Sequence, residues 1–329
     1  MISSDTRALL AYSFLKGVGK KFLSDLASEA ERSGQDIPSC FRTFKVQKKN
    51  VTEELIEQAF QQADEQVNIA VSKDHYIISK MDNDYPDTLK VIPDAPPILF
   101  CAGNLTLLKK PIITVIGTRE PTGHGEIIAS RVTSWFTQKG WVIASGLAKG
   151  IDTIAHTSCL NNDGETISVL AHGLEKIYPA ENKGLASKIT DKKGLLITEY
   201  KYNSYVGKAN FVERDRIQAA IAKAVVLVQS DVTGGSLHAS RASIEYGRYL
   251  IFLGQSKTDI SNQETKIGAN SLLINGSDAE KCKLLKTHKE GLRQVLYLSD
   301  KKCLDEIHEL IKQLSIKPPG SAGKTLNLL

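Results

Sequence analysis

Six short apolar runs recur between residues 112 and 254, each with Gly, Ser or Thr near its end and a helical segment after it. They are IITVIG (112–117), WVIASG (141–146), TISVLAHG (166–173), GLLITEY (194–200), AVVLVQS (224–230) and YLIFLG (249–254). Strands as uniformly apolar as these are typical of a parallel sheet that is covered by helices on both faces. The pattern therefore predicts an α/β fold with a mostly parallel sheet, whose ligands bind at the carboxyl ends of its strands.

The first 75 residues have a helical pattern instead, with apolar side chains at helical spacing on both sides of a Gly-Val-Gly break at 17–19 and again over 51–67. Thr52 is the predicted cap of the later helix, because Glu53 and Glu54 follow it and suit the positive end of the helix dipole. A proline-rich, extended stretch comes next. We expect four parts: a small helical domain at 1–75, an extended linker and lead-in at 76–110, the sheet domain at 111–285, and a C-terminal helical segment with a flexible tail at 286–329.

Charge and cysteine usage narrow the class of protein. The net charge of +5 permits a polyanionic partner without requiring one, since the face that carries the charge matters more than the total. The five cysteines are odd in number and form no CxxC, which is typical of a reduced, cytoplasmic protein. No apolar run approaches the roughly 20 residues of a membrane span, and MISSDTRALL lacks a secretory pattern. We expect no membrane association and, from the His and Cys spacings, no metal site.

Two strand ends lead directly into polar loops that suit phosphate. After the first run, Gly117 permits a sharp turn, Thr118 offers a hydroxyl and an N–H, and Arg119 supplies a planar fork. After the second run, Ser145 and Gly146 end a strand and Lys149 precedes a helix. A plain strand-to-helix turn with an exposed arginine is the alternative. The glycines do not have GxGxxG spacing, so no dinucleotide cofactor is expected. In the helix that follows, Asp152 is the predicted cap and His156 is expected to make a structural hydrogen bond.

Two further segments have similar chemistry. Phe211, Arg214 and Arg216 combine an aromatic ring with two cations at a helix start, which suits base stacking beside a phosphate; the alternative places Phe211 in the core and the arginines in salt bridges. Gly234, Gly235 and Ser236 follow a strand and precede a helix, an arrangement that favours anion binding by backbone N–H groups. Since the carboxyl ends of parallel strands share one edge of the sheet, we expect the four segments to form one basic groove with few carboxylates.

Enzyme signatures are weak in this sequence. GSAGKT at 320–325 imitates a phosphate-binding loop, but Pro318 occupies the position of the required first glycine and no strand precedes it. No serine, histidine and carboxylate have the spacing of a catalytic triad. We therefore expect no catalytic residues and no cofactor.

Several ordered motifs resemble the DNA-processing DprA (Smf) family. They are GTR (117–119), SGLAKGID (145–152), AH (155–156), YPAEN (178–182), FVERDR (211–216), TGGSLHAS (233–240) and GANSLLINGS (268–277), preceded by YPDTLKVIPDAPPILFCAGN (85–104). The resemblance implies an extended Rossmann-like domain behind a small SAM-like helical domain. It also implies a homodimer that binds single-stranded DNA and passes it to the recombinase RecA during natural transformation.

By position, the resemblance makes Arg119, Lys149, Phe211, Arg214 and the loop 234–236 the expected DNA contacts, with backbone or hydroxyl help from Ser145 and Gly146. LKGVGKK (15–21) resembles a helix-hairpin-helix turn, so Gly17, Gly19 and Lys20 are possible auxiliary contacts; an ordinary helix–helix turn is the alternative. The chain departs from the family pattern at three positions: Asp215 replaces the usual Asn, Gln229 a common Glu, and Leu253 a proline.

The resulting hypothesis is a sequence-independent single-stranded DNA-binding protein that protects incoming DNA and loads RecA. Two alternatives belong to other classes. A nucleotide-sensing module would bind a small phosphate ligand in the same groove. A nucleoside-monophosphate N-glycosidase (LOG-like) would use a PGGxGTxxE loop, which TGGSLHASRASIE resembles only superficially, because Leu237 and His238 replace its GT and Arg241 its glutamate.

Overall fold

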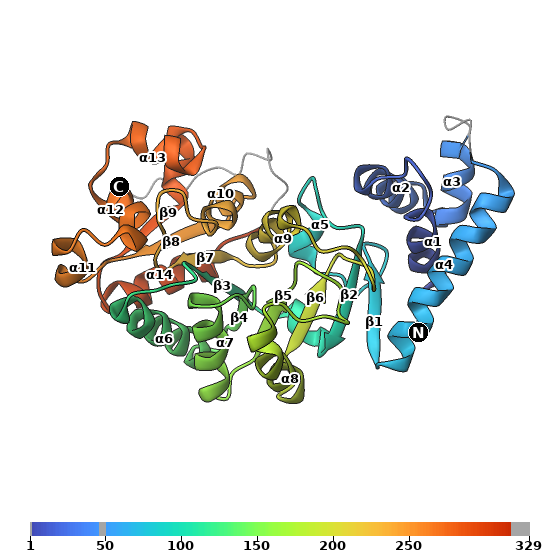
Figure 1. Ribbon diagram of the computed structural model, residues 1–329. Helices are drawn as coiled ribbons and strands as arrows, with labels where there is room; N and C mark the ends of the chain where they lie inside the picture. Colours follow the sequence, from blue (N-terminus) through green and yellow to red (C-terminus); the bar gives the residue numbers. More distant parts are fainter. Residues whose placement is uncertain (1, 46–50, 317–329) are drawn as a thin grey trace.

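The computed structural model describes residues 2–45 and 51–316, which form a nine-stranded sheet with helices on both faces and a helical unit at one end (Figure 1). The strand order is β1-β2-β6-β5-β4-β3-β7-β8-β9. The strands are β1 His75–Ser79, β2 Ile98–Gly103, β3 Ile112–Ile116, β4 Val142–Ser145, β5 Thr166–Val169, β6 Leu195–Thr198, β7 Ala224–Leu227, β8 Tyr249–Leu253 and β9 Val295–Leu298.

The six predicted apolar runs are the strands β3 to β8, and all of them are parallel to their neighbours in this part of the sheet. In the register, Ile113 of β3 lies opposite Ile143 of β4 and Ala224 of β7. Every residue of β3 to β7 is buried, which explains why the sequence shows no alternation of polar and apolar residues there. The predicted α/β fold is confirmed.

Helices cover the two faces of the sheet (Figure 1). Val115 and Val226 share a core with α6 (Gly123–Gln138), α7 (Ile151–Asn161) and α14 (Cys303–Lys312). Ile116 and Val225 belong to the core of the other face, under α9 (Lys208–Ala220) and α10 (Leu237–Glu245). The other helices between β1 and the C-terminal end of the described chain are α5 Asp87–Lys90, α8 Lys183–Asp191, α11 Lys257–Ser261, α12 Gly268–Asn275 and α13 Asp278–Leu285. The short 3-10 turns are η1 Leu105–Lys109, η2 Ala180–Asn182, η3 Thr265–Ile267 and η4 Lys289–Gln294.

The amino-terminal helices are α1 (Ser4–Tyr12), α2 (Lys20–Ser33), α3 (Ile37–Lys45) and α4 (Glu53–Ser72). Thr52 caps α4 as predicted, since its hydroxyl accepts the N–H of Leu55 at 3.3 Å. The helices do not stand apart from the sheet: Leu9 and Phe41 share one buried cluster with Ile77 of β1 and Phe100 of β2. The helical unit therefore packs directly on the antiparallel edge of the sheet.

The prediction of a linker at 76–110 is wrong. This stretch contains β2 and all but the first residue of β1. The two strands pair antiparallel with each other, and β2 also pairs antiparallel with β6. The prolines that suggested a linker lie between the two strands rather than inside them: Pro86, Pro93, Pro96 and Pro97. The sheet is thereby extended on the side of the helical unit.

The C-terminal part also differs from the predicted helical segment with a flexible tail, because β9 adds a parallel strand beside β8. Three of its four residues are not buried, so its sequence VLYL carries little of the pattern of a core strand. α14 follows and buries Leu304, Ile307 and Ile311. The predicted flexible tail beyond 316, including GSAGKT at 320–325, lies outside the described residues. In the described part of the chain, no helix combines the length and the apolar character needed to cross a bilayer.

The strand order creates a crevice at one point. From β3 the chain runs outward through β4, β5 and β6, then returns over the sheet through α9 to place β7 on the other side of β3. The loops that leave β3 and β7 therefore diverge. In open parallel sheets this reversal of strand order is where ligands bind, at the carboxyl ends of the strands.

Candidate functional site

A cavity of about 730 Å³ opens at this crevice. It brings together residues from three of the four predicted segments: Gly117, Thr118, Arg119, Phe211, Arg214, Gly234, Gly235 and Ser236. The loop after β4 contributes Ala148 to the lining, with Asp152 behind it. The expected convergence of strand-end loops is thus present in the fold.

The loop after β3 is held in place by the start of α7 and by the residues after β7. A Cβ on Gly117 would lie 2.6 Å from Cγ1 of Ile151, so only glycine fits there. The Thr118 N–H donates to the carbonyl oxygen of Gln229 at 2.8 Å, and the Ile151 N–H donates to that of Thr118 at 3.2 Å. The Thr118 N–H, predicted to face an anion, is therefore occupied. These contacts fix the loop and leave the next side chain, Arg119, exposed to solvent.

Arg119 lies over an aromatic surface. Its guanidinium carbon is 5.9 Å from the ring centroid of Phe211, at the start of α9. The ring of Tyr178 meets Phe211 edge to face, with centroids 5.4 Å apart, and is 54% exposed. A cation and two rings at the mouth of a cavity can attract a phosphate and stack a flat base at the same time.

The loop after β7 supplies backbone donors. Gly235 is exposed, and a side chain there would meet nothing within 4 Å. Within the described chain no acceptor is placed against the N–H groups of Gly235 and Ser236, which directly precede α10. The amino end of a helix carries partial positive charge, so these two groups are suited to an anion.

Arg214 has a different role from the one predicted. Its side chain is 5% exposed, and its Nη1 donates to the carbonyl oxygens of Gly146, at 2.6 Å, and of Val169. Its Nε donates to Asp215 at 3.1 Å. Gly146 is required here because a Cβ would lie 2.6 Å from Cζ of Arg214. Arg214 thus ties α9 to the ends of β4 and β5 and forms the floor of the cavity, rather than a free phosphate contact.

The cavity is less basic than predicted, since Glu120, Asp152, Asp215 and Asp231 also line it. Burial raises the pKa of Asp215 to about 6, although Arg214 opposes the rise. Burial likewise raises the pKa of Asp152, whose carboxylate accepts the N–H groups of Gly146 and Ala148, both at 3.2 Å. The expectation of few carboxylates is therefore wrong.

Asp152 also fails to cap α7 as predicted. The N-cap is Gly150, and Asp152 braces the preceding loop instead. His156 makes the expected structural bond, between Nδ1 and the Thr166 hydroxyl at 2.7 Å, and burial lowers its pKa to about 3.

Two residues of the second predicted segment lie apart from the cavity. Ser145 is fully buried and donates to the carbonyl oxygen of Val115 at 2.8 Å, so its hydroxyl is not available to a ligand. Lys149 is exposed in a small neighbouring pocket that Arg119 and Phe211 also line, and its Nζ pairs with Glu181 at 2.5 Å. Lys149 remains placed beside the aromatic cluster, but with a competing carboxylate.

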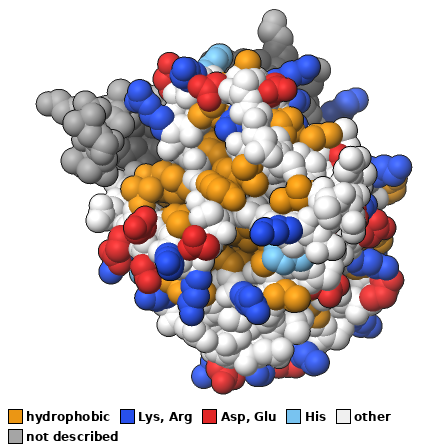
Figure 2. All heavy atoms as spheres, turned by 90° about the vertical axis from the view of Figure 1, so that its left-hand side faces the viewer, with side chains coloured by type: hydrophobic (Ala, Val, Ile, Leu, Met, Phe, Trp, Pro, Cys, Tyr) orange, Lys and Arg blue, Asp and Glu red, His pale blue; other side chains and the backbone are white. Residues whose placement is uncertain are grey.

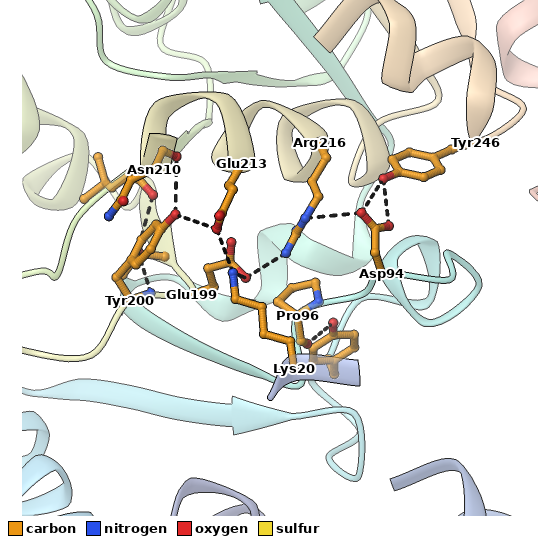
Figure 3. A network of polar contacts seen from close by, with 12 residues as sticks. Lys20, Asp94, Pro96, Glu199, Tyr200, Asn210, Glu213, Arg216 and Tyr246 are labelled. Carbon is orange, nitrogen blue, oxygen red and sulfur yellow. Dashed lines mark hydrogen bonds and ion pairs between the residues drawn. The ribbon is translucent and has the colours of Figure 1, made fainter. Parts of the chain in front are cut away.

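Arg216 projects from α9 into a partly buried polar network (Figure 3). It pairs with Glu199 at 2.7 Å and with Asp94 at 3.3 Å, and the Tyr246 hydroxyl donates to Asp94. Lys20 reaches the same network and pairs with Glu199 at 3.1 Å and Glu213 at 2.9 Å. Arg216 thus takes the salt-bridge role that was left open as the alternative.

The hairpin at 15–21 belongs to the same joint. Gly17 has a φ of 79°, which favours glycine, and Gly19 is the N-cap of α2. Through Lys20 the turn docks the helical unit onto α9 instead of lining the cavity. This favours the alternative of an ordinary helix–helix turn.

Several lining residues were not among the predicted contacts, including Tyr178, Lys208, Asp231 and Lys266. Lys208 lies one helical turn before Phe211, which was a usable signal. Lys266 comes from η3, beyond β8, and pairs with Glu120 at 2.8 Å; no local pattern connects it to the site. Among the described residues, no group of three or more His, Cys, Asp and Glu side chains is arranged to hold a metal ion.

Comparison with known proteins gives consistent results. The profile of the family described as DNA recombination-mediator protein A matches residues 76–289. Protein Smf of Synechocystis is 32% identical over 290 residues, which are 84% of this chain and 71% of that protein. DNA processing protein DprA of Bacillus subtilis is 39% identical over 165 residues, or 50% of this chain and 55% of the relative.

Two solved structures share the fold at 26% identity each. DNA processing protein A of Streptococcus pneumoniae aligns with a TM-score of 0.62, over 84% of this chain and 99% of that one. DNA processing protein A of Helicobacter pylori, studied for its single-stranded DNA binding mode, aligns with a TM-score of 0.58, over 73% of this chain and 97% of that one.

Proposed function

Because the chain belongs to the DNA recombination-mediator protein A family, we propose that it binds single-stranded DNA, without regard to base sequence, in the cavity at the ends of β3 and β7. The observation that carries the proposal is the meeting of Arg119, Phe211 and the Gly235–Ser236 amides at one opening. The single-stranded DNA binding mode described for the Helicobacter pylori relative supports it.

In the proposed complex, phosphates lie against Arg119, Lys208 and the amides of Gly235 and Ser236, and bases stack on Phe211 and Tyr178. Every base has a π face, and every nucleotide has a phosphate, so neither contact distinguishes one sequence from another. A duplex keeps its bases stacked inside and offers none to the two rings. Preference for single strands and tolerance of sequence follow from the same cluster.

We propose that binding involves no bond-breaking step. The two buried carboxyl groups of the cavity make structural hydrogen bonds. Asp152 accepts the N–H groups of two loop residues, and Asp215 accepts hydrogen bonds from Arg214 and Gln218. Incubation with AMP tests the rival glycosidase activity. Release of free adenine at a rate that falls in an Asp215→Asn variant would contradict the proposal.

The wider role is proposed on the same basis. Protection of incoming DNA during transformation and transfer to RecA fit a sequence-independent single-strand binder, and five free cysteines suit a reducing cytoplasm.

A homodimer is proposed as well: apolar side chains gather near the middle of the face at the α11–α13 end of the molecule (Figure 2). Light scattering after gel filtration tests the dimer, and a strand-exchange assay with RecA tests the transfer.

The decisive experiment is a mobility shift with labelled oligonucleotides, single- and double-stranded, over a series of salt concentrations. Single strands of different sequence should bind alike and more tightly than duplex, with a log–log salt slope near −0.7 for each phosphate neutralised. Binding that ignores salt, or that favours duplex, would exclude the proposal.

A nucleotide-sensing module remains the second candidate, because a cavity of about 730 Å³ has the size of a small-molecule site. Competition separates the two. If dAMP displaces a long oligonucleotide at a concentration similar to that of the oligonucleotide's nucleotides, the small ligand is the natural one. If dAMP competes only at a far higher concentration, the DNA strand is the natural ligand.

A further inference from the structure

A second cavity, of about 650 Å³, lies beside the first, and His238 lines both. Its walls come from α10, from the residues after α13 and from η4. Asp94, which pairs with Arg216 and accepts the Tyr246 hydroxyl, forms one side of it together with these two residues (Figure 3). The two cavities therefore share a boundary at the first turn of α10.

Beside Arg216, the second cavity is lined by further basic side chains: His238 and Arg241 on α10, and Lys286 and His288 just after α13. Arg241 is anchored, since its Nε donates to the carbonyl oxygen of Leu284 at 3.0 Å. Lys286 is exposed. Burial lowers the pKa of His238, and the nearby charges of Arg241 and Lys286 lower it further, which places the three side chains within each other's electrostatic range.

The charges of Arg241 and Lys286 are not balanced by neighbours. In the described ranges, no carboxylate lies within 4.0 Å of either side chain's nitrogen atoms. In and beside the first cavity, Lys149, Arg214 and Lys266 each have a carboxylate partner. Arg119 and Lys208 resemble Arg241 and Lys286 instead, since no ion pair joins them to a carboxylate in the described part of the chain. Unpaired positive charge thus continues from the first cavity into the second, on both sides of the first turn of α10.

Three acids also line the second cavity. Asp94 is already bonded to Arg216 and Tyr246. Glu245 follows Arg241 by one helical turn but makes no ion pair with it, and Glu290 lies on η4. Asp94 is therefore satisfied, and neither Glu245 nor Glu290 lies within 4.0 Å of a side-chain nitrogen of Arg241 or Lys286. These two cations remain open to an anionic ligand.

We propose that the second cavity is a phosphate subsite for the continuation of the same DNA strand, which crosses the first turn of α10 at His238 and reaches Arg241 and Lys286. The inference rests on the proposed function, because a strand must occupy the first cavity before it continues into the second. A free cation pair that adjoins the first site through a shared residue suits the next phosphates of a polyanion better than an isolated ion, since each added phosphate contact releases further counterions.

The test is a length series. Oligothymidylates from about 4 to about 16 nucleotides, the range over which single-strand binding folds set their site sizes, are titrated by fluorescence anisotropy. The proteins are wild type, Lys286→Gln and Arg241→Gln. Lys283→Gln is the matched control, because Lys283 is exposed on the same α13 segment and lines neither cavity. Arg241→Gln removes the hydrogen bond to Leu284 and can disturb the fold. Lys286→Gln removes no such bond, so it tests the proposal even if the Arg241 variant misfolds.

For the longest strand, each cavity variant should weaken binding about 3- to 10-fold and lower the salt slope by about 0.7, the contribution of one phosphate. For the shortest strand, wild type and variants should agree, and Lys283→Gln should follow wild type throughout. Equal losses at every length, or no loss at any length, would overturn the subsite while leaving the first site intact. Failure of wild type to bind any strand would instead remove the proposed function and the subsite together.

Discussion

Burial of the Asp215 carboxyl on α9 should make the folded protein lose stability as the pH rises, and the substitution Asp215→Asn should remove that loss. The pKa of Asp215 rises from an ordinary 3.8 to about 6, because burial outweighs the attraction of Arg214. The folded state therefore holds this proton more tightly than the unfolded chain. Its contribution to stability is complete below about pH 4 and is lost as pH rises through about 6.

The size of the effect follows from the two pKa values. The difference between 3.8 and about 6 corresponds to about 3 kcal/mol in the free energy of unfolding once both states are ionised. About 1.4 kcal/mol of it develops between pH 5 and pH 8, since the unfolded carboxyl is already ionised at pH 5. The uncharged Asn side chain has no such loss, so the variant should gain about 1.4 kcal/mol on wild type across this range.

Urea denaturation at pH 5, 6, 7 and 8 measures the difference directly. The matched control is Asp191→Asn, the same change at an exposed position on α8, which should stay parallel to wild type. If Asp215→Asn also stays parallel to wild type from pH 5 to pH 8, the carboxyl is not desolvated in the way that the structure indicates, and the reasoning is refuted.

The same substitution should affect the ligand. Asp215 lines the cavity, so at pH 8 its charge repels a bound phosphate. Removing it should strengthen binding by up to about 5-fold, the effect of a unit charge at about 4 Å in water. The gain should shrink towards pH 5, where the wild-type carboxyl becomes protonated, and anisotropy at the two pH values would show it.

Three other substitutions test separate parts of the site. Arg119→Ala should weaken binding of every sequence alike and flatten the log–log salt slope by about 0.7, and an unchanged slope in anisotropy titrations would argue against a phosphate contact. Gly146→Ala should lower the free energy of unfolding by about 1–3 kcal/mol because its Cβ would press on the Arg214 guanidinium, whereas Gly235→Ala, with open space around it, should change it far less; equal losses in urea would contradict the packing. Lys20→Gln should cost about 1 kcal/mol by breaking its ion pairs, with the salt slope of binding unchanged; a smaller slope would return Lys20 to the DNA contacts.

The parallel strands were predictable because burial on both faces leaves a plain signal, a mostly apolar run in which polar and apolar residues do not alternate. β1 and β2 gave a weaker one, since they form an antiparallel edge and enclose a proline-rich connection. β9 gave less still, because its short sequence is mostly not buried. The order of strands, which creates the crevice, depends on where α9 returns over the sheet, and no local pattern records that path.

A site residue was predictable where its position follows from the neighbouring sequence. It was not predictable where the position depends on the side of a helix from which the residue projects, or on a partner far away in the sequence. Gly117–Arg119 and Gly234–Ser236 directly follow strands, and their place at the cavity follows from that alone. Arg214 and Arg216 lie two apart on one helix, so they point to different sides, and the sequence did not reveal that both are engaged by neighbours. The carboxylate that pairs with Lys149 comes from Glu181, 32 residues away.

Hydrogen exchange with and without a saturating oligothymidylate tests the central claim, that separate loop tips make one binding surface for a strand. Exchange should slow together at 117–120, at 208–212 and at 231–238, while the helices at 4–33 exchange as before. Protection confined to those amino-terminal helices, or to only one of the three segments, would contradict the claim.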